Sequence, residues 1–476
     1  MSTAAIGWIW EDSRLPLVIG VLAAFLAASL FYTPIPLVLL VGIPACFYYI
    51  SRPYQLLLLM VFLIPFNFAF KIGSVPVAME LLKVFAWIPF FVFLWTRKQT
   101  LKTSRYNWCF AVFGGLLVLS VLRSNDLPFT VKESVRLGSN MGLCYLVLNL
   151  VDTREKVIQV FKVLAVSAFL VACYGFYQFA IQDFGALFWI VNPRLDTGLS
   201  HGRDTFWEWR NRITSVLTSE MELGHYFNLC LPVGVVLWLT EGRNRVASKW
   251  FLIVVAVLVG LLLTFTFAAW LSLAVTTGFF VLLFAQMRRW EMVLAGALML
   301  MLAASVVAFS PLRSFLEAKI LGTGMESLAW DVLTRWDSWL LALQAWRSHP
   351  FIGVGYGSFP SMTVGNLQWL TQGWVSSGSS PHNIYLYLLS ELGLIGLAAM
   401  VFIFLRTVRT NLQLLSMPGL GYAALGLAFA LTTTFVGGCS DDSALYGPHS
   451  SYLVWLFIGT SEAVFNLSAA NSARLR

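Results

Sequence analysis

The chain has 476 residues, of which 58% are hydrophobic and 11% are charged, and its mean hydropathy is +0.77. A soluble globular protein carries roughly a quarter charged residues, so this composition excludes a soluble protein and predicts one that is embedded in a bilayer. The formal net charge of +8 fits the excess of Lys and Arg in cytoplasmic loops of membrane proteins, which argues against a nucleic-acid-binding protein.

Apolar runs recur along the whole chain. They lie at residues 15–32, 35–50, 54–70, 79–95, 106–122, 137–151, 157–181, 223–240, 250–286, 292–310, 381–405, 415–436 and 450–467. A spanning helix needs about 20 apolar residues, so the long run 250–286 is counted as two spans. The sequence therefore predicts an all-α polytopic membrane protein with about 14 transmembrane helices.

Two long polar stretches divide these spans. The predicted segments are an N-terminal membrane bundle of about seven spans at 1–181, a periplasmic loop at 182–222, central spans at 223–310, a large periplasmic loop at 311–380 and C-terminal spans at 381–476. Lys and Arg gather in the loops that alternating spans place on one side, which predicts that this side and both termini are cytoplasmic.

The function is expected on the opposite face, in the periplasm or outside the cell, because both polar stretches lie there. These stretches are predicted to carry amphipathic helices at the membrane surface. The clearest runs from Met325 to Trp346, where Leu333, Trp336 and Leu340 recur at helical spacing.

The cysteines and acidic residues give little indication of a metal site. The six cysteines show neither a disulfide framework nor a CxxC pair. Asp441 and Asp442 form an acidic pair that could bind a divalent ion or accept a proton. Nothing near them in the sequence supplies further ligands.

The segment Ser379-Ser380-Pro381-His382-Asn383 opens the span at 381–405. Serine is a favoured N-cap and proline a favoured first helical residue, so we predict Ser380 as the cap and His382 in the first turn. A helix N-terminus favours anions and a neutral imidazole. His382 is therefore a candidate proton acceptor beside a bound phosphate, the alternative being a histidine that only forms hydrogen bonds at the interface.

Arginines near the outer face are candidate phosphate ligands, because guanidinium groups bind phosphate through two hydrogen bonds and keep their charge. Arg210 and Arg212 precede the span at 223–240, and Arg335 and Arg347 lie in the amphipathic segment. The alternative for each is contact with lipid headgroups. Glu391 lies inside a predicted span, where a carboxylate is costly unless it is paired, and nine positions from His382 it faces the opposite side of a helix.

These residues also carry a family resemblance. His382-Asn383, followed by nine residues and then Gly393-x-x-Gly396, resembles the His-Asn-x9-Gly-x-x-Gly signature of O-antigen ligases and polymerases. The preceding residues are similar to that family as well, namely Arg335, Trp339, Ala345, His349-Pro350, Gly353-Val354-Gly355 and, further upstream, Arg212 with Pro232.

The resemblance implies a metal-independent, inverting glycosyl transfer without a cofactor, at the bacterial inner membrane. The partners would be an undecaprenyl diphosphate-linked glycan, a lipid or saccharide acceptor and other polysaccharide assembly proteins. His382 would help to activate the acceptor hydroxyl and Arg335 would bind the pyrophosphate. Asn383, Gly393 and Gly396 would support the site, although two glycines four positions apart are also a common helix-packing device.

One departure from the family pattern leaves alternatives open. Phe267 stands where the family usually has an arginine, in the stretch from Thr264 to Ala269. Arg210 or Arg212 could replace that arginine from the adjacent loop. Ligase and polymerase remain alternatives to each other, and a transporter of lipid-linked sugars and a non-catalytic member of an assembly complex remain further alternatives.

Overall fold

The computed structural model describes residues 48–66, 71–124, 126–181, 212–240, 248–286, 325–360 and 380–474, apart from residues 50, 73, 74, 77, 99, 218 and 448. The described chain is helical except for one short antiparallel pair, β1 (Lys71–Ile72) and β2 (Val75–Pro76). The prediction of an all-α polytopic membrane protein is therefore confirmed in its class.

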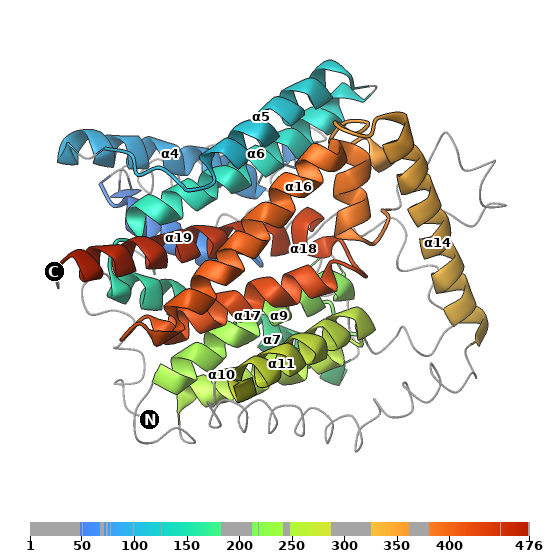
Figure 1. The fold of residues 1–476 in the computed structure, drawn as a ribbon. Helices are drawn as coiled ribbons and strands as arrows, with labels where there is room; N and C mark the ends of the chain where they lie inside the picture. The colour runs from blue at the N-terminus through green and yellow to red at the C-terminus, as the bar shows by residue number, and fades with distance from the viewer. Residues whose placement is uncertain are drawn as a thin grey trace.

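Figure 1 shows the arrangement of the described helices, most of which coincide with predicted spans. In chain order they are α3 (Pro53–Leu63), α4 (Ala78–Arg97), α5 (Asn107–Leu122), α6 (Leu127–Leu150), α7 (Arg154–Ile181), α9 (Glu220–Thr240), α10 (Lys249–Leu263), α11 (Phe267–Gln286), α14 (Met325–Ser348), α16 (Ile384–Gln413), α17 (Gly421–Gly437), α18 (Ser443–Tyr446) and α19 (Ser450–Arg474), with a 3-10 turn at Leu414–Ser416.

Five described helices, α7, α9, α11, α16 and α19, are long and apolar enough to cross a membrane, and α3, α5, α10 and α17 are shorter apolar helices. The run 250–286 is divided into α10 and α11, as predicted. The predicted spans at 15–32 and 292–310 lie outside the described residues, and so does the span at 35–50 except for residues 48 and 49. The total of 14 spans and the division into five segments stay predictions.

One helix begins well before its predicted span. We predicted 137–151, but α6 starts at Leu127, where the Asp126 side chain accepts the backbone N–H of Phe129 at 3.3 Å. The first turns of α6 are polar, so the apolar pattern did not reveal them. They are stabilised by an ion pair between Glu133 and Arg136, which are three positions apart and both largely buried.

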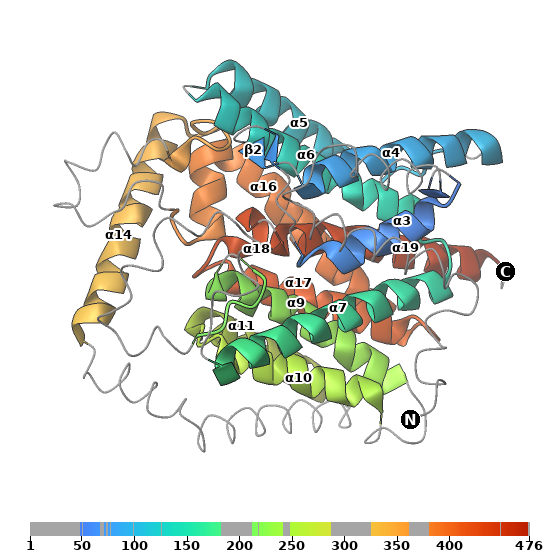
Figure 2. The same ribbon diagram turned by 180° about the vertical axis from the view of Figure 1, so that it is seen from behind.

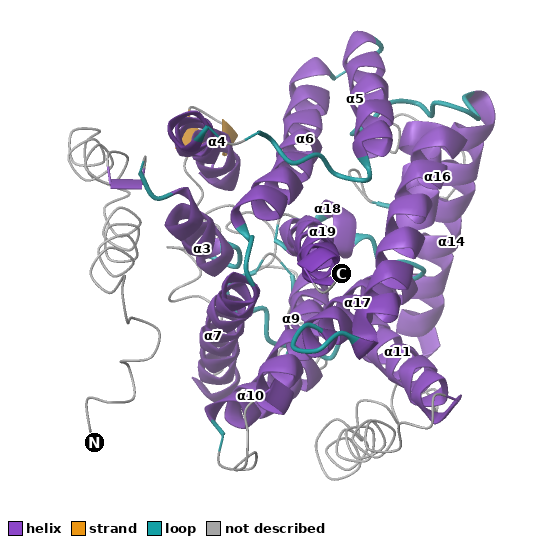
Figure 3. Ribbon diagram, turned by 60° about the vertical axis from the view of Figure 1, so that its left-hand side comes forward, coloured by secondary structure: helices purple, strands orange, loops and turns teal. Residues whose placement is uncertain are grey.

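Helix α9 lies inside the bundle and packs against α7, α10, α11, α17 and α19, and most of its residues are buried. Figure 2 shows α17 and α19 between helices α4 to α6 and the group of α7, α10 and α11, and Figure 3 shows α7 beside α10. Helix α14 runs across the ends of these helices (Figures 1 and 2). The prediction of a helix that begins at Met325 is therefore confirmed. Its predicted apolar stripe remains partly exposed, with Trp336 55% accessible, and this exposed stripe suits a helix at a membrane surface.

Helix α16 is not the continuous span that we predicted. Gly393 has φ +67° and ψ −169°, so it divides α16 into a first limb, 384–392, and a second limb, 394–413. The segment 349–360, which we call the wedge loop, enters this break. Backbone N–H groups of Val354 and Gly355 donate to Ser390 and Glu391 at 2.9 and 3.0 Å. In return, Leu394 N donates to Pro350 O at 2.9 Å and Ile395 N to Phe351 O at 3.2 Å.

Two glycines make this close approach possible. A Cβ atom on Gly353 would lie 2.2 Å from the carbonyl carbon of Glu391, and a Cβ atom on Gly393 would lie 2.3 Å from that of Phe351. Both glycines also have a positive φ, which disfavours any side chain. The glycines are therefore required where the wedge loop meets α16.

We expect Gly393→Ala and Gly353→Ala each to lower the free energy of unfolding by more than about 2 kcal/mol, since each adds backbone strain and a clash with backbone. Thermal unfolding of the purified protein in detergent measures this effect. Gly278→Ala is the matched control, because a Cβ atom on this helical glycine of α11 meets nothing within 4 Å. Equal melting temperatures for Gly393→Ala and Gly278→Ala would contradict the role of the break.

Candidate functional site

His382 lies just before α16 and not within its first turn. The N-cap is Asn383, whose side-chain oxygen accepts the N–H groups of Tyr385 and Leu386 at 3.0 Å each. The prediction of Ser380 as the cap was wrong, because asparagine caps at least as well as serine and distant backbone also holds Asn383. His382 is half-buried with φ +48°, a conformation that costs about 1–2 kcal/mol for a residue with a side chain.

The polypeptide between α17 and α18 holds this start of α16. Ile384 N donates to Gly438 O at 2.8 Å, and the Asn383 side-chain amide donates to Cys439 O at 3.0 Å. We call residues 438–442 the bridge segment. Its fixed backbone determines where His382 lies.

Arg335 reaches the same segment from α14. Its guanidinium donates from Nη1 to Ser440 O at 2.5 Å, and Trp339, one turn later, donates from Nε1 to Pro381 O at 2.8 Å. The structure therefore brings Arg335 and the His382-Asn383 pair, 47 positions apart in the sequence, to one stretch of backbone. Arg347, at the other end of the same helix, is exposed.

Arg212 lies in a different place, at the turn between α10 and α11. It donates to the carbonyl oxygens of Thr264 and Phe265 at 3.1 and 3.2 Å, and its Nη1 lies 2.9 Å from Glu220. Phe267, two residues after one of these carbonyls, is 53% exposed. Arg212 is thus beside the position where the family arginine is replaced. Arg210 lies outside the described residues.

The glycines of the motif have separate roles in the structure. Gly393 forms the break in α16. At Gly396 a Cβ atom would come within 2.3 Å of the Leu392 side chain and 3.4 Å of Leu116 in α5. Gly396 therefore allows close packing at the bend, as the helix-packing interpretation expects.

Two buried pairs of histidine and carboxylate lie at and near the bridge segment. His225 Nε2 is 3.6 Å from Asp441 Oδ2, and Glu222 Oε1 accepts the backbone N–H of His449 at 2.8 Å and lies 2.9 Å from its Nδ1. Sequence reasoning missed these pairs. The spacing of Glu222 and His225, three apart on one helix face, was the available signal.

The two aspartates of the bridge segment differ in charge state. Burial raises the pKa of Asp441, but the His225 side chain and hydrogen bonds from Ser443 outweigh it and hold the pKa below its usual range. Burial, with the negative charge of Asp441, raises the pKa of Asp442 to about 7, although Ser380 and Arg335 oppose the shift. Asp442 is therefore a group that can exchange a proton near neutral pH beside Arg335. Among the described residues no cluster of three or more His, Cys, Asp or Glu side chains could hold a metal ion.

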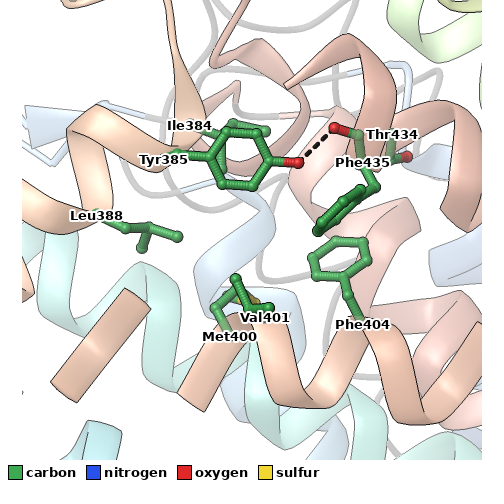
Figure 4. A pocket seen from close by; sticks show the side chains of 8 residues that line it. All are labelled: Ile384, Tyr385, Leu388, Met400, Val401, Phe404, Thr434 and Phe435. Atoms are coloured by element: carbon green, nitrogen blue, oxygen red, sulfur yellow. Dashed lines mark hydrogen bonds between the residues drawn. The ribbon is translucent and has the colours of Figure 1, made fainter. Parts of the chain in front are cut away.

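An apolar groove lies beside the start of α16. Its lining comes from both limbs of α16 and from α17, namely Ile384, Tyr385, Leu388, Met400, Val401, Phe404, Thr434 and Phe435 (Figure 4). The Tyr385 hydroxyl points across the groove and donates to Phe435 O at 2.5 Å. The lining therefore includes residues on both sides of the bend at Gly393.

The raised pKa of Asp442 predicts a pH-dependent effect of Asp442→Asn. A carboxyl whose pKa is higher in the folded protein is destabilising when ionised, and this cost grows from about pH 4, its unfolded value, to above pH 7. Asp442→Asn should therefore raise the melting temperature relative to the unchanged protein more at pH 8 than at pH 5. The same difference at both pH values would contradict the raised pKa.

Comparison with protein families places this geometry in context. Residues 251–401 match the family described as O-antigen ligase. This range includes Arg335, His382-Asn383 and the wedge loop, whereas Arg212 and the bridge segment lie outside it. A search of curated proteins found no match. Through its residues 251–401, which contain the His-Asn motif, the chain is similar to the O-antigen ligase family.

Proposed function

We propose that this multi-pass membrane protein is a glycosyltransferase that moves a glycan from undecaprenyl diphosphate to a lipid or saccharide acceptor on the periplasmic face of the inner membrane. It acts as an O-antigen ligase or as a polymerase of surface polysaccharide. The observation that carries the proposal is the convergence of Arg335 and His382-Asn383 on the bridge segment.

In the proposed reaction the acceptor hydroxyl attacks the anomeric carbon of the donor sugar from the side opposite the diphosphate. The new C–O bond forms as the bond from that carbon to the diphosphate oxygen breaks, and undecaprenyl diphosphate leaves with the electron pair. His382 takes the proton of the hydroxyl. Arg335 stabilises the charge that develops on the leaving diphosphate, a role for which a permanent, two-pronged cation is suited.

Asp442 provides the next step for the proton. The pKa of Asp442 is about 7, and the group interacts with Ser380 and Arg335. It can therefore accept a proton that His382 releases and later release that proton to the solvent. His225 keeps Asp441 ionised beside it. The two aspartates are therefore expected to differ in charge near neutral pH, with Asp442 as the group that exchanges a proton.

Arg212, held at the turn that precedes Phe267, is a second candidate for the diphosphate in place of the missing family arginine, with Arg210 as its neighbour in the sequence. Asn383, Gly393 and Gly396 support the site by fixing the start and the bend of α16.

A non-catalytic role in a polysaccharide assembly complex is the second candidate, and Phe267 is the observation that favours it. The two candidates differ in what His382 does. A partner protein without catalysis needs its fold and surface but not an imidazole, so substitution of His382 separates them. A transporter of lipid-linked sugars is less favoured, because the wedge loop fills the break in α16 with backbone hydrogen bonds.

We expect His382→Ala and Arg335→Ala each to lower the rate of glycan transfer at least about 100-fold, as the loss of a general base or of a charge-stabilising donor does. The measurement uses purified protein in lipid nanodiscs with a lipid-linked glycan donor and an acceptor. Arg347→Ala is the matched control, because it removes an exposed arginine from the same helix. Near-normal transfer by both variants would refute the proposed mechanism.

A further inference from the structure

Glu391 is a buried carboxylate that the proposed reaction does not use. It lies two residues before the break in α16 and is fully buried. Its Oε2 accepts the backbone N–H of Gly357 at 2.9 Å, and its Oε1 accepts that of Phe359 at 3.0 Å. Its own backbone oxygen accepts the N–H of Gly355 at 3.0 Å. Glu391 of α16 therefore accepts the N–H groups of every second residue of the wedge loop from Gly355 to Phe359.

The far end of the wedge loop is packed against α14. Phe359 is fully buried and belongs to a small apolar cluster with Leu341 and Ala342 of α14 and Tyr387 of α16. The rings of Phe359 and Tyr387 are 5.8 Å apart between centroids. Because Phe359 is the residue whose N–H Glu391 binds, the carboxylate fixes the side chain on which α14 rests.

Arg335 lies on the same rigid helix as this cluster. It precedes Leu341 by six residues, less than two helical turns, and its guanidinium must reach Ser440 O across the gap between α14 and the bridge segment. A change in the height or tilt of α14 at the cluster moves Arg335 by a comparable amount. The position of the Arg335 guanidinium, the proposed diphosphate ligand, thus depends on where Phe359 packs.

We propose that Glu391 is a positioning residue for the transfer reaction: by binding the N–H groups of Gly357 and Phe359, its carboxylate seats the wedge loop and thereby sets where α14 holds Arg335 relative to His382. This inference rests on the proposed function, since it assigns Glu391 an effect through Arg335. The carboxylate itself touches neither substrate nor reacting atoms.

Glutamate is the residue type that these two hydrogen bonds require. Its two oxygens each accept one N–H, whereas glutamine offers one oxygen and turns an NH2 group toward the other N–H. Glu391→Gln keeps the size of the side chain but breaks one of the two bonds. A displacement of about 1 Å at a catalytic site costs on the order of 100-fold in rate, so we expect Glu391→Gln to lower transfer about 10- to 100-fold.

A double-mutant cycle separates positioning from general destabilisation. The partner substitution is Arg335→Lys, which keeps the charge but loses the two-pronged geometry. If Glu391 acts through Arg335, Glu391→Gln lowers transfer strongly in the unchanged protein and less than about threefold in the Arg335→Lys background. Effects that multiply in full would overturn the proposal. Ser390→Ala is the neighbouring control, since among the described residues the Ser390 hydroxyl donates to Tyr387 O of its own helix, and its transfer rate should stay unchanged.

A structural measurement tests the same claim without activity. Cys439 is exposed in the bridge segment, and Trp336, next to Arg335, is 55% exposed. In a protein with Trp336→Cys and the other cysteines replaced by serine, a short bismaleimide should join the two thiols. Adding Glu391→Gln should slow this cross-linking at least severalfold, while adding Ser390→Ala should not. An unchanged rate would overturn the positioning role.

The outcomes keep the two proposals apart. If Arg335→Ala and His382→Ala retain transfer, the proposed function fails whatever Glu391 does. If those variants lose transfer while Glu391→Gln matches Ser390→Ala in both rate and cross-linking, the proposed function stands and the positioning role fails.

Discussion

The exchange of backbone hydrogen bonds between the wedge loop and the break in α16 is the constraint on which the site depends. A helix that breaks inside a membrane protein leaves N–H and C=O groups without partners, and each costs several kcal/mol in an apolar surrounding. Here the wedge loop supplies the missing partners from Pro350 to Gly355. The break can therefore be sharp without being unstable, provided that glycines stand at the two points of closest approach.

The rest of the site follows from this exchange. The bend turns the first limb of α16 so that its start meets the bridge segment, where Asn383 caps the helix and His382 takes its strained conformation. The wedge loop is also the direct continuation of α14, so the contact that stabilises the bend fixes the helix that carries Arg335. The start of α16 and helix α14, which are distant in the sequence, are thus both positioned by the contact between the wedge loop and the break.

Several charged side chains lie near the start of α16 and the bridge segment. Arg335 donates to the bridge segment, Asp442 has a pKa near neutrality, and Asp441 is paired with His225. Glu222 is bound to His449. Buried carboxylates are costly unless they are paired or protonated, and in this cluster each has a histidine, a proton or an arginine nearby. Because the pKa of Asp442 is raised to about 7, this carboxyl can exchange a proton near neutral pH.

The sequence predicted the parts of this structure that depend on local periodicity. The division of α10 from α11, the helix from Met325 and the pairing of His382 with Asn383 in one motif follow from apolar spacing and residue type. The break in α16 did not, because a glycine in an apolar run gives the same pattern whether it packs or bends, and what bends it here is a loop some 40 positions earlier. The choice of Asn383 over Ser380 as cap depends in the same way on backbone at Gly438 and Cys439, and the pairing of Glu222 with His449 joins residues 227 positions apart.

The most direct measurement of the central claim is the polysaccharide profile of a bacterial strain that lacks the protein, with surface lipopolysaccharide, secreted polymer and lipid-linked intermediates separated. The account predicts that undecaprenyl diphosphate-linked glycan accumulates. Full-length chains together with bare lipid core would identify a ligase, and single repeat units would identify a polymerase. An unchanged profile in all three fractions would contradict a glycosyl transfer by this protein.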